Sequence, residues 1–144
     1  MKSVFSKITF LLILIIGFLS CAQNSKSSNV SETIEINNVK EVIAVISPEE
    51  FNKNMGDIQL VDVRTPKEFS EGHLKNAVNI DFFDASFMDD MGKLDKNKEL
   101  YIYCRSGNRS GKASKKLKAA GFTKVYDLEG GIIKWNKNNF EVIK

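Results

Sequence analysis

Short apolar runs alternate with helix-start signals along the chain, and this alternation limits its fold more than any other feature. The run IQLVDVR, residues 58–64, is apolar at most positions, which is typical of a strand covered on both faces. Further short runs predict strands over 42–46, 77–80, 99–104 and 124–128. Strands that alternate with helices at such short spacing predict an α/β fold, with a parallel sheet and helices on both of its faces. Ligand sites in such folds lie at the carboxyl ends of the strands.

Two helix starts have the same pattern of a capping residue, a proline and a glutamate. Residues 47–50 and 65–68 each begin with Ser or Thr, continue with proline and end with glutamate. They predict short helices that end near Met55 and Gly72. Gly121 is placed to end a third helix. The helices expected in the second part of the chain cover 85–94, 109–120 and 131–137.

The beginning of the chain differs from the rest. Two lysines precede an apolar stretch over 8–19, and Ser20 and Cys21 follow it. A charged start, about a dozen apolar residues and a small residue are typical of a secretory signal, and the position of Cys21 resembles the lipidation site of a bacterial lipoprotein. We therefore expect a signal peptide over 1–20 and a lipid on Cys21. The alternatives are an uncleaved anchor and an ordinary secreted protein.

Residues 21–38 are polar and rich in serine and asparagine, which predicts a tether between the lipid and a domain over 39–144. On this interpretation the protein is exported and held at a membrane by its N-terminal lipid, and the domain faces the periplasm or the cell surface. The chain has 21 basic and 18 acidic residues, and two of the basic ones lie in the predicted signal peptide. This near balance gives no reason to expect nucleic acid as a partner.

Cys104 is the only cysteine outside the predicted lipidation site. If Cys21 carries lipid, Cys104 has no partner for an internal disulfide, so it is either buried and inert or kept for its reactivity. It ends the predicted strand 99–104, and a helix is expected from Arg109. A tight turn between the two directs backbone N–H groups inward, and the helix N-terminus favours an anion there. We expect the thiol to ionise below the pKa of about 8.5 of free cysteine.

Three separated motifs resemble one family. They are LVDVRTPKEFSEGHL over 60–74, YCRSGNRS over 103–110 and LEGGIIKW over 128–135. In this order and spacing the chain resembles a single rhodanese domain, the sulfurtransferase homology module, over about 39–144. The resemblance implies a rhodanese-like α/β fold with a parallel five-stranded sheet, and it implies that Cys104 holds a sulfane sulfur as a persulfide. The cradle of the persulfide would be formed by Arg105, Ser106, Gly107, Asn108 and Arg109.

The residue types fit this chemistry. A thiolate that attacks the outer sulfur of thiosulfate expels sulfite, so no general base is required. The single histidine, His73, lies far from Cys104 in the sequence, which argues against a Cys–His protease and against a zinc site. No metal or cofactor is expected. Four residues separate Cys104 from Arg109, one fewer than in related phosphatases and arsenate reductases, and the smaller loop suits a single sulfur atom.

These features predict a sulfurtransferase that moves sulfane sulfur from thiosulfate or a persulfide donor to a thiol or cyanide acceptor. The alternatives are a sulfur-carrier or partner-docking module without turnover, and an inactive scaffold. An easily ionised thiol outside the cytoplasm is prone to overoxidation, so a periplasmic thiol reductant is an expected partner.

Four further residues are expected to be structural. Asp62 interrupts an apolar strand and needs hydrogen-bond or charge partners, and Arg109 is one candidate. Arg64 and Glu68 are four residues apart and can pair, although Glu68 can equally close the capping box. His73 is expected to fasten a turn.

Surface and core roles are expected for the remaining prominent side chains. Arg105 either touches an anionic substrate or serves solubility, and Ser106 and Ser110 offer hydroxyl donors to the loop. Trp135, with Ile132 and Ile133, is expected on the apolar face of the last helix. We expect a solvated helix face formed by Lys112, Lys115, Lys116 and Lys118. The same face could also steer anionic donors.

Overall fold

The computed structural model describes residues 40–144. The predicted signal peptide, the lipidation site at Cys21 and the tether to residue 38 lie outside these described residues. Within 40–144, no helix has the length and the apolar character that crossing a bilayer requires.

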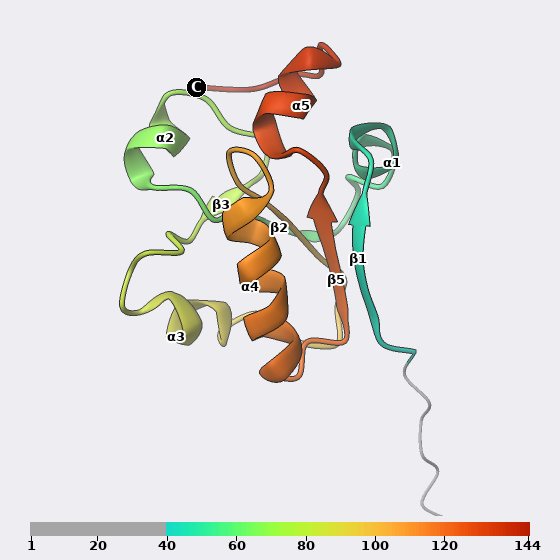
Figure 1. Ribbon diagram of the computed structural model, residues 1–144, viewed down its shortest axis with the longest axis vertical. Helices are drawn as coiled ribbons and strands as arrows, with labels where there is room; N and C mark the ends of the chain where they lie inside the picture. Colours follow the sequence, from blue (N-terminus) through green and yellow to red (C-terminus); the bar gives the residue numbers. More distant parts are fainter. Residues whose placement is uncertain (1–39) are drawn as a thin grey trace, which may run out of the picture. The chain divides into compact units, whose positions relative to one another are not determined.

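The described residues form a parallel sheet of five strands, in the order β1-β5-β4-β2-β3 (Figure 1). Every neighbouring pair is parallel, so the carboxyl ends of all the strands lie along one edge of the sheet. The middle strand is β4, and all of its residues are buried. The strands are β1 (Val42–Ile46), β2 (Gln59–Asp62), β3 (Val78–Asn79), β4 (Leu100–Tyr103) and β5 (Lys124–Leu128).

Helices form at each segment where the sequence predicted one. The side-chain oxygens of Ser47 and Thr65 accept hydrogen bonds from backbone N–H groups three residues later, and Glu68 closes the capping box of the second helix. Gly121, with a φ of 89°, follows the longest helix. The third helix is shorter than the expected 85–94. The helices are α1 (Pro48–Lys53), α2 (Pro66–Ser70), α3 (Phe87–Met91), α4 (Asn108–Ala119) and α5 (Gly131–Lys137).

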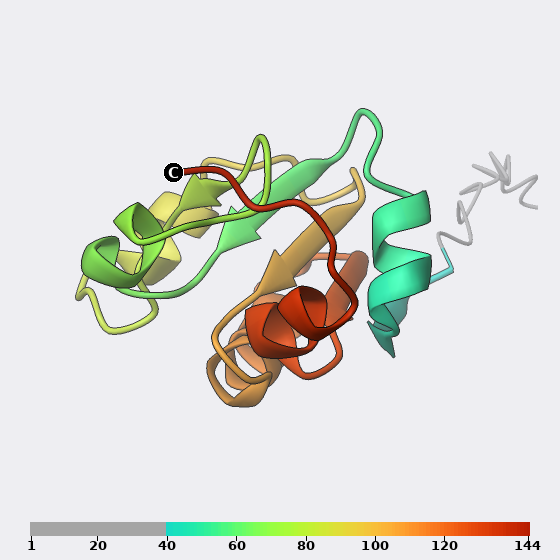
Figure 2. The ribbon, with the colours of Figure 1, turned by 90° about the horizontal axis from the view of Figure 1, so that it is seen from above.

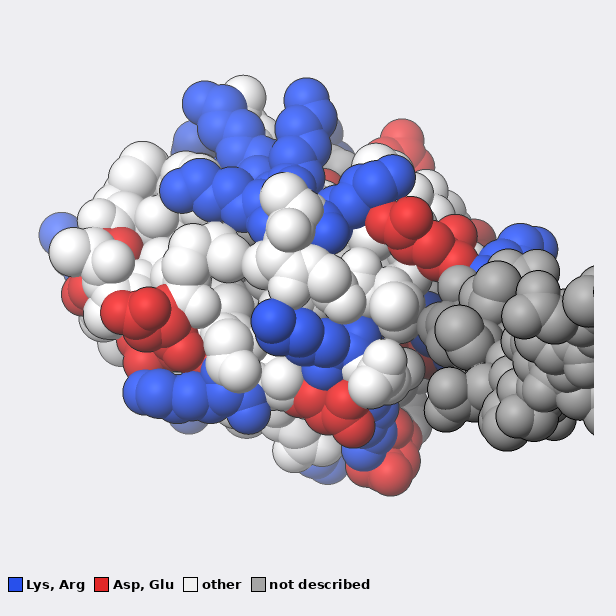
Figure 3. Space-filling view, turned by 90° about the horizontal axis from the view of Figure 1, so that it is seen from below, with Lys and Arg blue, Asp and Glu red and all other residues white. Residues whose placement is uncertain are grey.

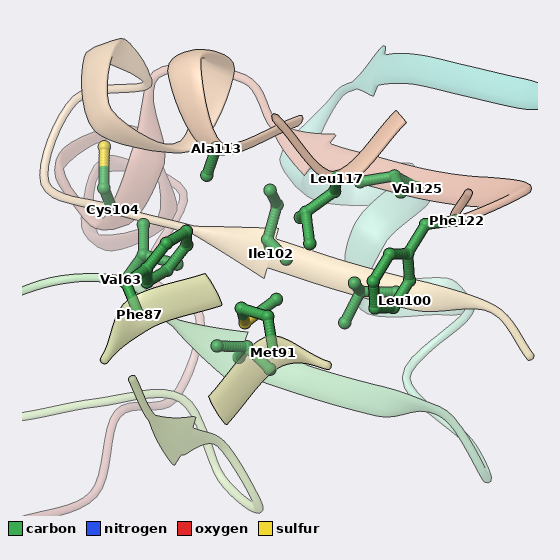
Figure 4. Packing of buried hydrophobic residues seen from close by; sticks show 11 residues of the cluster. Val63, Phe87, Met91, Leu100, Ile102, Cys104, Ala113, Leu117, Phe122 and Val125 are labelled. Carbon is green, nitrogen blue, oxygen red and sulfur yellow. The ribbon is translucent and has the colours of Figure 1, made fainter. Parts of the chain in front are cut away.

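Two clusters of buried side chains cover the two faces of the sheet. One packs the sheet against α3 and α4 and includes Ile102 and Leu117 (Figure 4). The other packs it against α1 and α5 and includes Phe51 and Trp135. Successive residues of β4 contribute to opposite clusters, as the pleat of a strand requires. The predicted arrangement, with helices on both faces, is confirmed.

The apolar face of α5 is narrower than the sequence indicated. Trp135 and Ile132 are buried in the core, and the indole N–H of Trp135 donates to the carbonyl oxygen of Glu141 at 3.0 Å. Ile133, by contrast, is 37% exposed, so its expected place on the buried face is wrong.

The lysines of α4 form the expected solvated face, because Lys112, Lys115, Lys116 and Lys118 are all exposed. Figure 3 views the domain from the end where the strands begin, and lysine and arginine side chains gather along one side of that view.

Candidate active site

The carboxyl end of β4 leads directly into a loop over residues 104–107, the cysteine loop, which carries Cys104. This residue follows the last residue of β4, and α4 begins at Asn108, so the turn between strand and helix is short. Gly107 completes the turn with a φ of 92°, in the left-handed region that glycine adopts without strain. Figure 4 shows the sulfur of Cys104 at the end of β4, directed toward the turn into α4. The predicted strand, turn and helix are confirmed.

In the described part of the chain, two donors lie within hydrogen-bond distance of the sulfur of Cys104. The backbone N–H of Gly107 lies 3.1 Å from Sγ, and the hydroxyl of Ser110 lies 3.4 Å from it. Burial raises the pKa of the thiol, because Cys104 is only 1% exposed. The hydroxyl of Ser110 and backbone N–H groups of the loop lower this pKa, and their combined effect exceeds that of burial. The pKa of Cys104 therefore lies below its ordinary value, the direction expected from the sequence.

A second glycine turn, between β5 and α5, supports the back of this loop. The N–H of Ile132 donates to the carbonyl oxygen of Cys104 at 2.9 Å, and the N–H of Ile133 donates to that of Arg105 at 3.2 Å. Figures 1 and 2 show α5 beside the loop. Gly131 has a φ of 58°, and a Cβ at this position would clash with the backbone of Cys104 and Arg105. Only glycine fits so close to the cysteine loop.

Arg109, in the first turn of α4, ties the loop to α2. Its two terminal nitrogens donate to the carboxylate oxygens of Glu68 at 2.6 and 2.7 Å. The expected pairing of Arg109 with Asp62 is therefore wrong. Hydrogen bonds from Arg109 hold the pKa of Glu68 at about 2, despite the opposing effect of burial. Because Glu68 also caps α2 through Thr65, one carboxylate joins a helix start to the cysteine loop.

A profile of the rhodanese-like domain family matches residues 47–138, which include the cysteine loop and the glycine turn behind it. The chain belongs to the rhodanese-like family. A sulfurtransferase of Allochromatium vinosum is 34% identical to it over 87 residues, which are 60% of this chain and 79% of that protein. The crystal structure of a rhodanese-related protein from Thermoplasma volcanium has a TM-score of 0.63 at 28% identity, over 69% of this chain and 96% of that one.

Longer relatives contain the same domain as a part. A tRNA uridine(34) hydroxylase of Aster yellows witches'-broom phytoplasma is 36% identical over 116 residues, which are 76% of this chain but only 38% of that protein. Family membership therefore establishes a rhodanese-like domain with sulfurtransferase relatives.

Asp62, the last residue of β2 in the rhodanese domain, is fully buried and is paired with Arg64. The guanidinium donates to both carboxylate oxygens over 2.6 to 3.0 Å, and its Nη2 also donates to the carbonyl oxygen of Gly72 at 2.7 Å. Arg64 therefore pairs with Asp62 rather than with Glu68. These contacts join β2 to the turn after α2, which fits the structural role expected for both residues.

His73 lies where the segment after α2 meets the end of the chain. Its backbone N–H and carbonyl group both pair with Ile143 at 2.8 Å, and its ring stacks on Phe69 with a centroid separation of 3.7 Å. The Nδ1 atom lies 3.1 Å from the carbonyl oxygen of Phe69. These contacts join the segment after α2 to the end of the chain, and the role of His73 in fastening a turn stays a prediction.

The other residues of the loop differ in exposure. Arg105, Ser106 and Asn108 are exposed, whereas Gly107 is half-buried. Within residues 40–144, Arg105 takes part in no ion pair. The same part of the chain contains no group of three His, Cys, Asp or Glu side chains arranged to hold a metal ion.

Sequence reasoning missed two residues near the site: Gly131, which lies against the cysteine loop, and Asp127, which lies against the first turn of α4. Gly131 was only part of a matching motif, although a Gly-Gly pair directly after a strand was a signal for a close backbone approach. Asp127 lies within the predicted strand KVYDL and received no separate role from the sequence. In the structure it is 3% exposed. An acidic residue within an apolar strand was the available signal, and it is the same signal that drew attention to Asp62.

Proposed function

We propose that this protein is a sulfurtransferase that carries sulfane sulfur on Cys104 as a persulfide. The decisive observation is the surroundings of Sγ, where a backbone N–H and a hydroxyl lie within 3.4 Å and the pKa of the thiol is lowered. The thiolate is the nucleophile in such chemistry. Donors that stabilise a thiolate also suit the anionic persulfide that replaces it. The relatives named sulfurtransferase support the same reaction class.

In the first half-reaction, the thiolate of Cys104 attacks the outer sulfur of thiosulfate or of a persulfide donor. A new S–S bond forms, the S–S bond of the donor breaks, and sulfite or a thiolate leaves with the electron pair. With Cys104 only 1% exposed, donors that approach with a single terminal atom are favoured. In the second half-reaction, a thiol or cyanide acceptor attacks the outer sulfur of the persulfide, and Cys104 leaves as a thiolate.

The two arginines of the loop have different roles in this proposal. Arg109 is held by both oxygens of Glu68 and braces the loop. Arg105 is exposed and is the cation that attracts an anionic donor. Ser106, Gly107 and Asn108 complete the cradle around the persulfide.

The intact mass of the purified, pre-reduced protein after exposure to thiosulfate tests this proposal. We expect a gain of one sulfur atom that dithiothreitol removes and that is absent in Cys104→Ser. Cys21→Ser is the matched control, because it removes the other cysteine and should keep the adduct. Steady formation of thiocyanate with cyanide then distinguishes an enzyme from a sulfur carrier. The absence of an adduct on pre-reduced protein would contradict both.

We also propose that the protein is exported and anchored through a lipid on Cys21, so that the domain faces the periplasm or the cell surface. The sequence of the first 21 residues supports this placement. A periplasmic thiol reductant would then keep Cys104 reduced. The test is fractionation of cells that express the wild type or Cys21→Ala. The wild type should sediment with membranes and the variant should not, and equal distribution of the two would contradict lipid anchoring.

A further inference from the structure

We propose that Cys104, Ser110 and Asp127 form a buried relay that shares one proton between the thiol and the carboxyl group. The inference rests on the proposed function, because it assigns a proton path to the same cysteine. The three residues come from different elements: Cys104 follows β4, Ser110 lies in the first turn of α4, and Asp127 lies on β5. Figure 1 shows α4 beside β5.

Asp127 is a buried carboxyl group without a full set of hydrogen bonds. It is 3% exposed, and its buried Oδ1 atom has no hydrogen-bond partner among residues 40–144. Its Oδ2 atom lies against α4, since a Cβ added at Gly111 would be 3.6 Å from it. Burying a polar oxygen without a partner is unfavourable, so such a group calls for an explanation other than packing.

No lysine, arginine or histidine pairs with Asp127 within residues 40–144. Its neighbours across the sheet are Val45 on β1 and Ile102 on β4. The helices α1 and α5 pack against the opposite face, and the lysines of α4 are exposed. Burial therefore raises the pKa of Asp127 to about 6, even though hydrogen bonding by Ser110 lowers it. The carboxyl group can exchange its proton near neutral pH.

Ser110 is the link between the two titratable groups. Its side chain is fully buried, and its Oγ atom lies 3.4 Å from the sulfur of Cys104. A hydroxyl group donates one hydrogen bond and accepts others. When Asp127 is ionised, the thiol can donate to Oγ while the hydroxyl donates to the carboxylate. When Asp127 is protonated, the carboxyl group donates to Oγ while the hydroxyl donates to the thiolate.

The two arrangements contain the same protons and the same total charge. Moving one proton from sulfur to Oγ and one from Oγ to the carboxylate converts the first into the second, with no water or other co-reactant. When an acceptor releases Cys104 as a thiolate, the relay can return a proton to it. Because two negative charges beside one hydroxyl are unfavourable, the thiol and the carboxyl group are expected to titrate as a coupled pair.

The rate of alkylation of Cys104 by iodoacetamide, measured against pH, tests the relay. Mass spectrometry of the peptide that carries Cys104 separates its reaction from that of Cys21, and the carboxyl 13C resonance of Asp127 reports its protonation. In the wild type we expect two titration steps, with the Asp127 resonance changing in both. Asp127→Asn should show one step and about tenfold faster alkylation near pH 6, because the amide cannot hold a negative charge.

Two serine variants complete the design. Ser110→Ala should uncouple the groups, so that the thiol titrates in one step at higher pH and the Asp127 resonance in another. Ser114→Ala is the matched control: Ser114 is a buried serine one turn later on α4, and it should keep both steps. A single step in the wild type that is unchanged in Asp127→Asn and Ser110→Ala would overturn the relay.

Persulfide formation, measured in the same samples, keeps the two proposals apart. An adduct with thiosulfate and a one-step thiol titration would refute the relay and leave the proposed function standing. Two-step titration without any adduct would support the shared proton and refute the proposed function.

Discussion

Two buried aspartates of this domain lie at the same edge of one sheet and have opposite surroundings. Asp62 ends β2 and Asp127 lies near the end of β5, and they are 0% and 3% exposed. The guanidinium of Arg64 donates to both oxygens of Asp62, whereas Asp127 has the hydroxyl of Ser110 beside it and no cation of residues 40–144 pairs with it. The Asp62–Arg64 pair thus joins β2 to the turn after α2, whereas Asp127 can exchange a proton.

The difference shows how the partner decides the role of a buried acid. Burial by itself lowers the pKa of Arg64, but the hydrogen bonds to Asp62 and the attraction of nearby negative charges together more than offset burial, so the pKa of Arg64 is raised. Asp127 has no such compensation, and its pKa rises to about 6. A carboxyl group of this second kind, one hydroxyl away from a reactive thiol, is suited to proton transfer.

Removal of Arg64 should make the surroundings of Asp62 resemble those of Asp127, because Asp62 would then lose its cationic partner. We expect Arg64→Ala to lower the free energy of unfolding at neutral pH by about 3–5 kcal/mol, because an unpaired buried charge remains. Urea denaturation measures the loss. The double variant Asp62→Asn, Arg64→Met should recover part of it, and a loss of less than about 1 kcal/mol, typical of a surface pair, would contradict the role given to Arg64.

Neutralising Asp127 should stabilise the domain, whereas removing Arg64 should destabilise it. The folded pKa of about 6 lies above the unfolded value of about 3.9, so the fold favours the protonated form, and stability falls as the pH rises through this window. We expect Asp127→Asn to raise the free energy of unfolding by about 1–3 kcal/mol above pH 6 and to have no such effect near pH 4. Denaturation at both pH values checks this. An equal gain at each would point to packing rather than to charge.

Glu68 resembles Asp62 in having an arginine partner, Arg109, but it is less buried, with 26% of its side chain exposed. Its folded pKa of about 2 lies below the unfolded value of about 4.3, so its stabilisation is complete above the unfolded pKa and is lost as the pH falls toward 2. Glu68→Gln should lower the free energy of unfolding at neutral pH by about 1 kcal/mol, and the deficit should shrink in acid.

The control for Glu68 is a surface pair of the same charge types. Asp90 pairs with Lys93, whose side chain is 75% exposed, so Asp90→Asn should change stability less than Glu68→Gln does. Equal effects of the two variants in thermal or urea denaturation would show that the bracing of the cysteine loop by Arg109 adds nothing to an ordinary surface contact.

Local features of the sequence were sufficient to predict much of this molecule. The capping patterns at Ser47 and Thr65 act over three residues, and the apolar runs reflect burial of each strand on both faces, so strands, helices and the place of Cys104 followed from neighbouring residues. The signal peptide and the lipid on Cys21 stay predictions from local sequence.

Only the tertiary structure decided which side chains meet. Glu68 pairs with Arg109, 41 residues away along the chain, whereas the sequence suggested Asp62 as a partner of Arg109 and Arg64 as a partner of Glu68. Asp127 meets Ser110 because α4 packs against β5, and Gly131 reaches Cys104 because β5 lies next to β4 in the sheet. Hydrogen-bond and charge pairing depends on distance in space, and the order β1-β5-β4-β2-β3 that sets those distances results from packing of the whole domain.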